Sequence, residues 1–134
     1  MTKTVLDEVL DAAFEYIANR GDLLTLCAGV PTSFFEATTL TNSGGKMVAS
    51  SALTEGVGGG DFSLAAGTTS GRRLTIAARA LVDAQVVGTV DHLAIVDQDT
   101  GALLSVTELT ESVAMTPGDV VGIKSFSQEI AAPV

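Results

Sequence analysis

Apolar residues at the start of the chain recur with the spacing of an amphipathic helix. Thr4 is placed to cap its N-terminus, Asp7 and Glu8 occupy the first turn, where acidic groups favour the helix dipole, and Gly21 follows at a position that ends many helices. The positions that form the apolar stripe are Val5, Leu6, Val9, Leu10, Ala13, Phe14 and Ile17. This pattern predicts a helix over about residues 4–19, and we expect its stripe to pack on the chain's own sheet.

The pattern changes after Gly21, where threonine, valine and isoleucine become frequent and apolar positions alternate with polar ones. Within Leu74–Ala78, for example, positions 74, 76 and 78 face one way, and Thr75 and Ala77 face the other. Candidate strands cover 23–28, 45–53, 62–65, 74–80, 89–96, 102–109, 113–115 and 120–130.

Two of the segments between these strands have the chemistry of specific turns. Asp97–Gly101 joins two strong strands as a short hairpin, and Thr116–Asp119 carries Pro117 and Gly118 at the central positions of a type II turn. Strands at this spacing, with no helical pattern between them, indicate antiparallel pairing. We therefore expect a mainly β fold, an antiparallel β-sandwich or barrel with one N-terminal amphipathic helix.

The length of 134 residues and the mass of 13.6 kDa correspond to one domain. We expect a single domain over 1–134, with the helix at about 4–19 and a β-rich body at about 23–130. Although 46% of the residues are hydrophobic, only 4% are aromatic, so much of the core is made of small side chains. Such a core buries little area, and we expect the chain to associate with other copies or with a larger assembly.

The charge balance excludes several classes of partner. The chain has 16 Asp and Glu against 7 Lys and Arg, which leaves a net charge of −9. Binding to nucleic acid depends on cations that neutralise phosphates, and anionic membranes attract cations as well. No apolar run approaches the roughly 18 residues that a membrane-spanning helix needs. We therefore expect no nucleic-acid partner and no membrane association.

Candidates for catalysis are few. Cys27 is the single cysteine, so it forms no intrachain disulfide, and its apolar neighbours indicate a buried, inert thiol. His92 is the single histidine, and on a regular strand its neighbour Asp91 would point to the opposite face. Any two carboxylates could meet, but no spacing selects a pair. We expect no catalytic residue and no enzymatic activity.

Two motifs approach a ligand-binding pattern without completing it. Asp97, Asp99 and Glu108 have the first, third and twelfth positions of a calcium loop, but Ala102 stands where that loop requires glycine, and both flanks predict strands. In 56–61 an aspartate replaces the last glycine of a dinucleotide-binding pattern, and a strand follows instead of a helix. We expect ordinary loops at both places, with no metal and no cofactor.

A series of short segments spans almost the whole chain in a fixed order. They are TLCAGVPT (25–32), FEA (35–37), GDF (60–62), TSGRRLTIA (69–77), GTVDHLAIVD (88–97), LLSV (103–106), PGDVV (117–121), Phe126 and Glu129-Ile130. In this order, and behind an amphipathic helix with Tyr16-Ile17 near its end, the series resembles a group of small virion proteins of tailed bacteriophages.

The resemblance implies a non-enzymatic structural protein of the virion, assembled in the host cytoplasm, with the major capsid protein or another virion protein as its partner. We expect a capsid decoration (cement) protein on the outer head surface, because an acidic, β-rich chain of this size suits an exposed surface that binds many copies. A neck, tail or fibre-associated structural protein is the first alternative. A surface carbohydrate-binding β-sandwich is the second, disfavoured because the chain has no tryptophan and one tyrosine.

The residues expected to contact the partner are Phe34, Phe35 and Arg72. On an extended segment the adjacent phenylalanines would face opposite sides, so only one could enter the subunit's own core. In a single strand Arg73 and Arg79 would share one side and Arg72 would face the other. We expect a homo-oligomer, a trimer at local threefold positions of the capsid, with Phe34 or Phe35 as its anchor and Arg72 as a charged contact.

Overall fold

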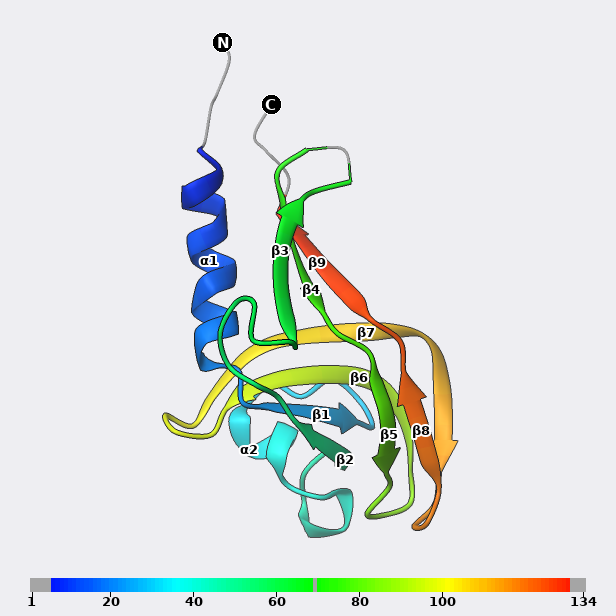
Figure 1. Cartoon of the computed structure of the whole chain (residues 1–134). Helices are drawn as coiled ribbons and strands as arrows, with labels where there is room; N and C mark the ends of the chain where they lie inside the picture. The colour runs from blue at the N-terminus through cyan, green and yellow to red at the C-terminus, as the bar shows by residue number, and fades with distance from the viewer. Residues whose placement is uncertain (1–5, 69, 131–134) are drawn as a thin grey trace. The chain divides into compact units, whose positions relative to one another are not determined.

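The computed structural model describes residues 6–68 and 70–130 and divides them into two compact units. The first, here called the helical unit, takes the residues up to 20, then 54–78, and those from 124 onward; the second, the strand unit, takes 21–53 and 79–123. Strands make up 49% and helices 18% of the described residues. A mainly β fold with antiparallel sheets and a helix near the N-terminus is thus confirmed (Figure 1). The single domain expected over 1–134 stays a prediction.

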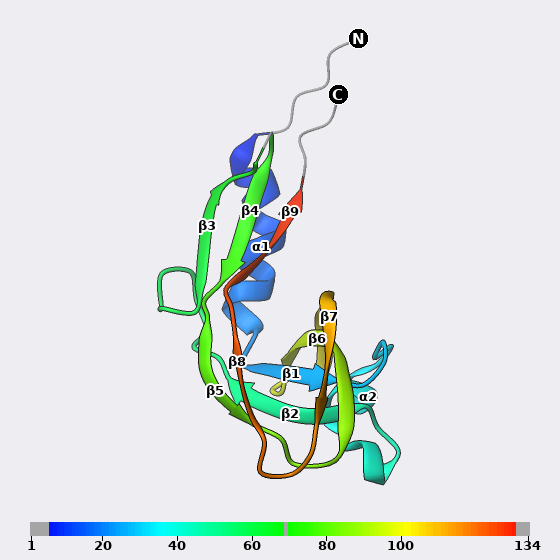
Figure 2. The same ribbon diagram turned by 90° about the vertical axis from the view of Figure 1, so that its right-hand side faces the viewer.

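The helical unit packs one helix against a three-stranded antiparallel sheet, and Figure 2 shows the helix lying along the sheet. Helix α1 covers Asp7–Arg20. The strands, in sheet order, are β3 (Phe62–Ala66), β4 (Arg72–Ile76) and β9 (Phe126–Ile130). The buried apolar side chains of these elements are Leu10, Phe14, Ala18, Phe62, Leu74 and Ile76.

Only part of the predicted apolar stripe of α1 is buried. Leu10, Phe14 and Ala18 recur every four residues and face β3 and β4. Leu6 and Val9, expected in the same packed stripe, are exposed, because they lie on a part of the helix circumference that is turned away from the sheet. The expected cap at position 4 lies outside the described residues.

The strand unit contains a four-stranded antiparallel sheet and a further strand pair. The sheet order is β2 (Met47–Ala52), β1 (Leu23–Cys27), β6 (Gly88–Asp97) and β7 (Ala102–Met115), while β5 (Arg79–Asp83) pairs with β8 (Val120–Ile123). Helix α2 (Phe34–Thr38) and the 3-10 turn η1 (Thr41–Ser43) connect β1 to β2. Among the described residues the sheet stays open at β2 and β7, so the barrel alternative is wrong and the arrangement is consistent with a β-sandwich.

Both turns expected from the sequence are present. Asp97–Gly101 reverses the chain between β6 and β7, and the Gly101 N–H donates to the Asp97 carbonyl at 2.9 Å. In Thr116–Asp119 the Asp119 N–H donates to the Thr116 carbonyl, also at 2.9 Å. Gly118 in this turn has a φ of 96°. A positive φ at the third residue is what a type II turn requires, which accounts for the glycine.

Several predicted strands have different limits in the structure. The run predicted at 74–80 is divided into β4 and β5, and the run predicted at 120–130 is divided into β8 and β9. At each division the chain passes from one compact unit to the other, which a local alternation of apolar residues does not record. The runs at 102–109 and 113–115 instead form the single strand β7.

Candidate functional site

Phe34 and Phe35 lie at the start of α2, so the extended segment expected there is wrong. Ser33 caps this helix with an extended backbone (φ −150°), and its Oγ accepts a hydrogen bond from the Glu36 N–H at 3.2 Å. The Glu36 carboxylate reaches back and accepts from the N–H and the hydroxyl of Thr32 at 2.8 and 2.7 Å. These two hydrogen bonds hold the pKa of Glu36 below its ordinary value of 4.5.

The signal for this helix was present in the sequence. Ser33 and Glu36 have the spacing of a capping box, in which a serine and an acid three residues later satisfy the free N–H groups at the start of a helix. Here the acid serves the residue before the cap instead of the cap itself.

The helix directs the two phenylalanines into different environments. Phe34 is half-buried and packs on a cluster of fully buried side chains. The cluster consists of Cys27, Ala37, Ala94 and Val96. Phe35 is 59% exposed, since successive helical residues lie about 100° apart and only one of the two can face the sheet. The structure therefore leaves Phe35 as the exposed member of the pair.

Arg72, expected as a charged contact, is engaged within the helical unit. Its Nε donates to Oδ1 of Asp11 on α1 at 2.7 Å, and the two side chains are 20% and 17% exposed. This hydrogen bond raises the pKa of Arg72.

Arg73 and Arg79, expected on one side of a single strand, lie on β4 and β5 in different units. Phe35 also belongs to a different unit from Arg72, so the structure describes no common site for them.

Asp91 and His92 form a hydrogen bond that a regular strand would forbid. His92 Nδ1 lies 2.8 Å from Oδ1 of Asp91, although the two residues are adjacent on β6. The register of β6 with β7 shifts between Val90 and His92, where Asp91 alone lies opposite residues 109–112 of β7, so regular pairing is interrupted at Asp91. The Gly29 N–H also donates to Oδ1 of Asp91, at 2.7 Å. The bonds from His92 and Gly29 hold the pKa of Asp91 below its ordinary value of 3.8.

The strand register places Cys27 directly opposite His92, so a cysteine, a histidine and an aspartate are neighbours on β1 and β6. A cysteine nucleophile requires access to substrate and a lowered pKa. Cys27 is fully buried, and desolvation raises its pKa above the ordinary value of 9.0. The Thr25 hydroxyl lies 3.5 Å from its sulfur. These surroundings favour the neutral thiol and are the reverse of those of an activated nucleophile.

Asp97 is buried, and its carboxylate organises the turn between β6 and β7. Oδ1 accepts from the N–H groups of Asp99 and Thr100 at 3.0 and 3.4 Å, and Oδ2 accepts from the Thr100 hydroxyl at 2.7 Å. The residue is 3% exposed. Because both oxygens serve the turn, this geometry accounts for an aspartate here without a calcium ion.

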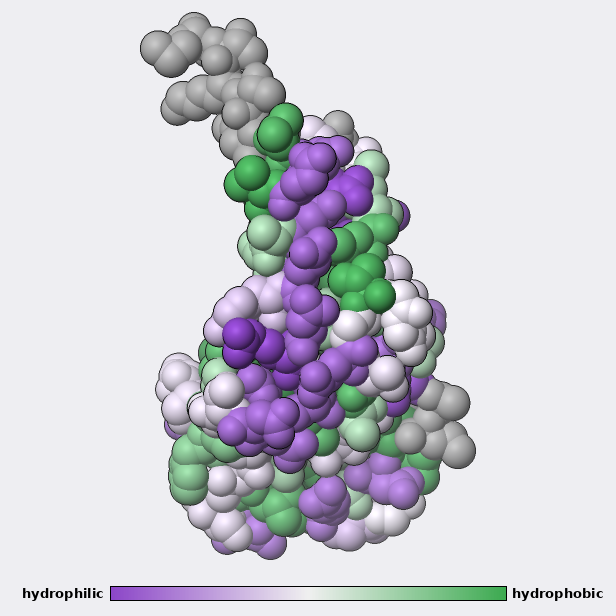
Figure 3. Space-filling model, turned by 60° about the vertical axis from the view of Figure 1, so that its left-hand side comes forward, coloured by the Kyte–Doolittle hydropathy of each residue, from purple (hydrophilic) through white to green (hydrophobic). Residues whose placement is uncertain are grey.

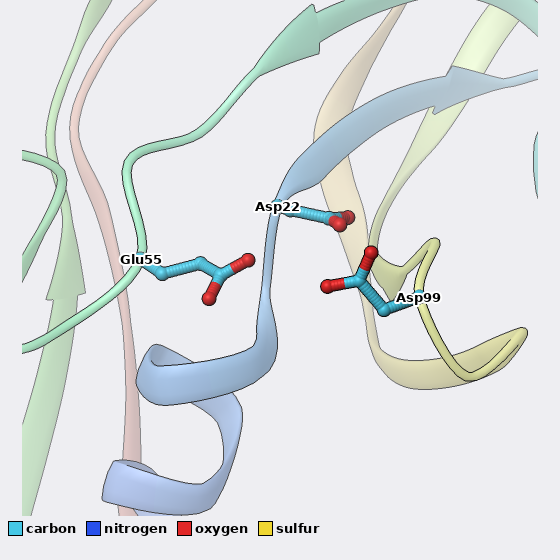
Figure 4. A group of neighbouring side chains, drawn as sticks. All are labelled: Asp22, Glu55 and Asp99. Atoms are coloured by element: carbon cyan, nitrogen blue, oxygen red, sulfur yellow. The ribbon is translucent and has the colours of Figure 1, made fainter.

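Asp99, the second residue of the calcium-like spacing, points toward Asp22, which immediately precedes β1 (Figure 4). Oxygens of the two carboxylates lie within 4.8 Å of each other, and the Gln98 N–H donates to Oδ1 of Asp22 at 3.0 Å. The third carboxylate drawn in Figure 4, Glu55, belongs to the helical unit and is left out of this pair. Two carboxylates are far from the six to eight oxygens, roughly, that a calcium ion takes.

The glycine-rich segment 56–61 forms a hydrogen-bonded loop before β3. The Thr54 N–H donates to Oδ2 of Asp61 at 2.6 Å, and the Gly58 N–H donates to the Phe62 carbonyl at 2.9 Å. A phosphate loop would lead into the N-terminus of a helix, whose free N–H groups hold the anion. A strand follows here, so the aspartate closes a loop instead of completing a nucleotide motif.

An open depression of about 410 Å³ lies on the strand unit. Its lining residues are Thr41, Asn42, Gln85, Val86, Val87 and Pro117. The lining offers amide and hydroxyl groups, but it holds no aromatic ring on which a sugar could stack.

No helix in the described part of the chain is long and apolar enough to cross a membrane. Comparison with known protein families, with curated proteins and with solved structures finds no match.

Proposed function

We propose that this chain is a non-enzymatic structural protein of tailed-bacteriophage particles, and that it decorates the outer head surface by binding the major capsid protein. The ordered series of segments that resembles small virion proteins supports this role. The net charge of −9 supports it as well, because like charges keep a protein soluble when many copies are displayed side by side.

The observation that carries the proposal is that Phe35 is exposed on a helix held in place by its cap and its packing. An anchor for a partner is exposed in the free protein and is held rigidly, so that little conformational entropy is lost on binding. Phe35 is 59% exposed, and its helix is fixed by the Ser33 cap, by the packing of Phe34 and by the complete burial of Ala37. Its ring is therefore presented by a rigid helix and is free to enter a pocket on the capsid.

The test measures occupancy of the purified protein on heads that lack it. Phe35→Ala should weaken binding by about tenfold or more, as an interface hot spot does. It should leave the free energy of unfolding within about 0.5 kcal/mol of the wild type, since the side chain is exposed. Val87→Ala is the matched control, because Val87 is 65% exposed in the same unit, and it should change neither quantity.

Occupancy of Phe35→Ala equal to that of the wild type would contradict the anchor. Wild-type protein that does not bind heads would contradict the decoration role. Copy number in purified virions then distinguishes the alternatives: a number comparable with that of the major capsid protein supports the head, and a small number set by the symmetry of the tail favours the neck, tail or fibre. A chain absent from virions would contradict a structural role in the particle. The carbohydrate-binding alternative has less support, because the open depression lacks an aromatic platform.

A further inference from the structure

Helix α1 carries a second apolar face, which its own sheet leaves exposed. Leu6, Val9, Ala13 and Tyr16 follow one another at intervals of three, four and three residues, the a and d spacing of a coiled-coil seam. Leu6, whose carbonyl accepts the first helical hydrogen bonds, is 64% exposed, and Val9 and Tyr16 are 60% and 54% exposed. These four residues are here called the α1 seam.

The α1 seam is distinct from the row that packs on the sheet. At about 100° per residue, its centre lies about 120° around the helix from that of Leu10, Phe14 and Ala18. The bond from Arg72 to Asp11 fixes which face of α1 turns toward the sheet, so a rotation that buried the seam would break it. Figure 3 shows hydrophobic surface on both sides of a hydrophilic band that runs along α1.

The acidic residues of α1 avoid the seam. They are Asp7, Glu8, Asp11 and Glu15. Arg20 occupies the next seam position after Tyr16, and its guanidinium carbon lies 4.4 Å from the centre of the Tyr16 ring. On a chain with a net charge of −9, the α1 seam is thus a surface on which two copies can meet without bringing acidic groups together.

We infer that two copies of this chain associate through the α1 seam, as an antiparallel helix pair about a twofold axis. The inference concerns the free protein and does not depend on the role proposed above. The trimer expected at local threefold positions of the capsid stays a prediction, and the pair inferred here has named contact residues.

The sizes and charges of the seam residues favour the antiparallel direction. In an antiparallel pair the a and d positions alternate across the interface, so Tyr16 of one copy packs on Leu6 of the other, and Ala13 packs on Val9. A parallel pair would set alanine against alanine and tyrosine against tyrosine, which leaves a gap beside a crowded layer. It would also set Arg20 against its own copy, whereas the antiparallel pair moves Arg20 to the end where the other copy has its acidic first turn.

The pair is expected to be weak. Four side chains on each helix bury well under the about 800 Å² per partner of a standard interface, so the dissociation constant should be on the order of 10 μM.

The first test is sedimentation of the full chain over a concentration series. The mass should rise from 13.6 kDa toward twice that value as the concentration passes the order of 10 μM. Val9→Glu places acidic groups inside the seam and should weaken association by about tenfold or more. Tyr16→Ser should weaken it without adding a charge. Val87→Glu, the same exchange at an exposed valine of the strand unit, is the matched control and should associate as the wild type does.

The second test measures direction by cross-linking with a short bis-maleimide. Leu6→Cys and Tyr16→Cys are both exposed positions, and the native Cys27 is buried and out of reach of the reagent. A mixture of the two variants should cross-link to each other, and each variant alone should not. Cross-linking of each variant to itself would overturn the antiparallel direction. A monomer at every concentration, a mass of three subunits, or equal weakening by Val9→Glu and Val87→Glu would overturn the pair itself.

Discussion

Replacing Asp97 should destabilise the strand unit through the β6–β7 turn, and the size of the effect follows from its geometry. Asp97→Ala removes the acceptor of three hydrogen bonds, from two N–H groups and one hydroxyl. A hydrogen bond to a charged group contributes about 1.5–3 kcal/mol, but Asp99 and Thr100 are exposed, and their donors can return to water. Since the three bonds share one acceptor, their contributions do not add, and we expect a loss of about 3 kcal/mol.

The assay is urea unfolding followed by circular dichroism at neutral pH. Asp97→Asn keeps one carbonyl oxygen and should lose about half as much free energy of unfolding as Asp97→Ala. Asp99→Asn is the control, because this exposed carboxylate accepts none of the three bonds and should change stability by less than about 0.5 kcal/mol.

The same series separates a turn from a metal site. If a cation held Asp97 and Asp99 together, both substitutions would destabilise the protein to a similar degree, and EDTA would lower the stability of the wild type, because a ligand bound only to the folded state stabilises it. Equal effects of the two substitutions, a response to EDTA, or a loss below about 0.5 kcal/mol for Asp97→Ala would refute the reasoning.

Three further outcomes are expected. Cys27, buried and with a raised pKa, should react with a thiol reagent only when the protein unfolds, so its modification should be slow without urea and rapid in urea; fast labelling of the native protein would contradict its burial. Because folding lowers the pKa of Asp91, its carboxylate stabilises the folded protein fully above the ordinary pKa of 3.8, and this contribution is lost as the pH falls through the folded value. The difference in free energy of unfolding between the wild type and Asp91→Asn should therefore shrink in acid. A difference that stays constant with pH would be inconsistent with this. Arg72→Met should lower the melting temperature by loosening α1 from β4, and Asp11→Asn should lower it in the same way; in the double variant the losses should be less than additive, and full additivity would mean that the ion pair contributes nothing.

The sequence by itself determined the elements whose causes are local. The 3.6-residue period of the first segment predicts α1, because an apolar stripe and its first-turn acids need no knowledge of the rest of the chain. Pro117 and Gly118 predict their turn for the same reason, since the φ values that the turn requires belong to those two residues alone. The spacing of Ser33 and Glu36 is also a local signal, and it indicates the start of helix α2.

Tertiary structure alone decided which strands pair with each other and which side chains are buried. The runs 74–80 and 120–130 alternate without a break, yet each is divided between two units, because strand pairing depends on partners that are distant in the sequence. The pairing of β6 with β7 is interrupted at Asp91, and there Asp91 meets His92 against the alternation of a regular strand. The sheet of the helical unit packs on one side of α1 and buries one row of its residues, so the α1 seam, about 120° around the helix, stays exposed.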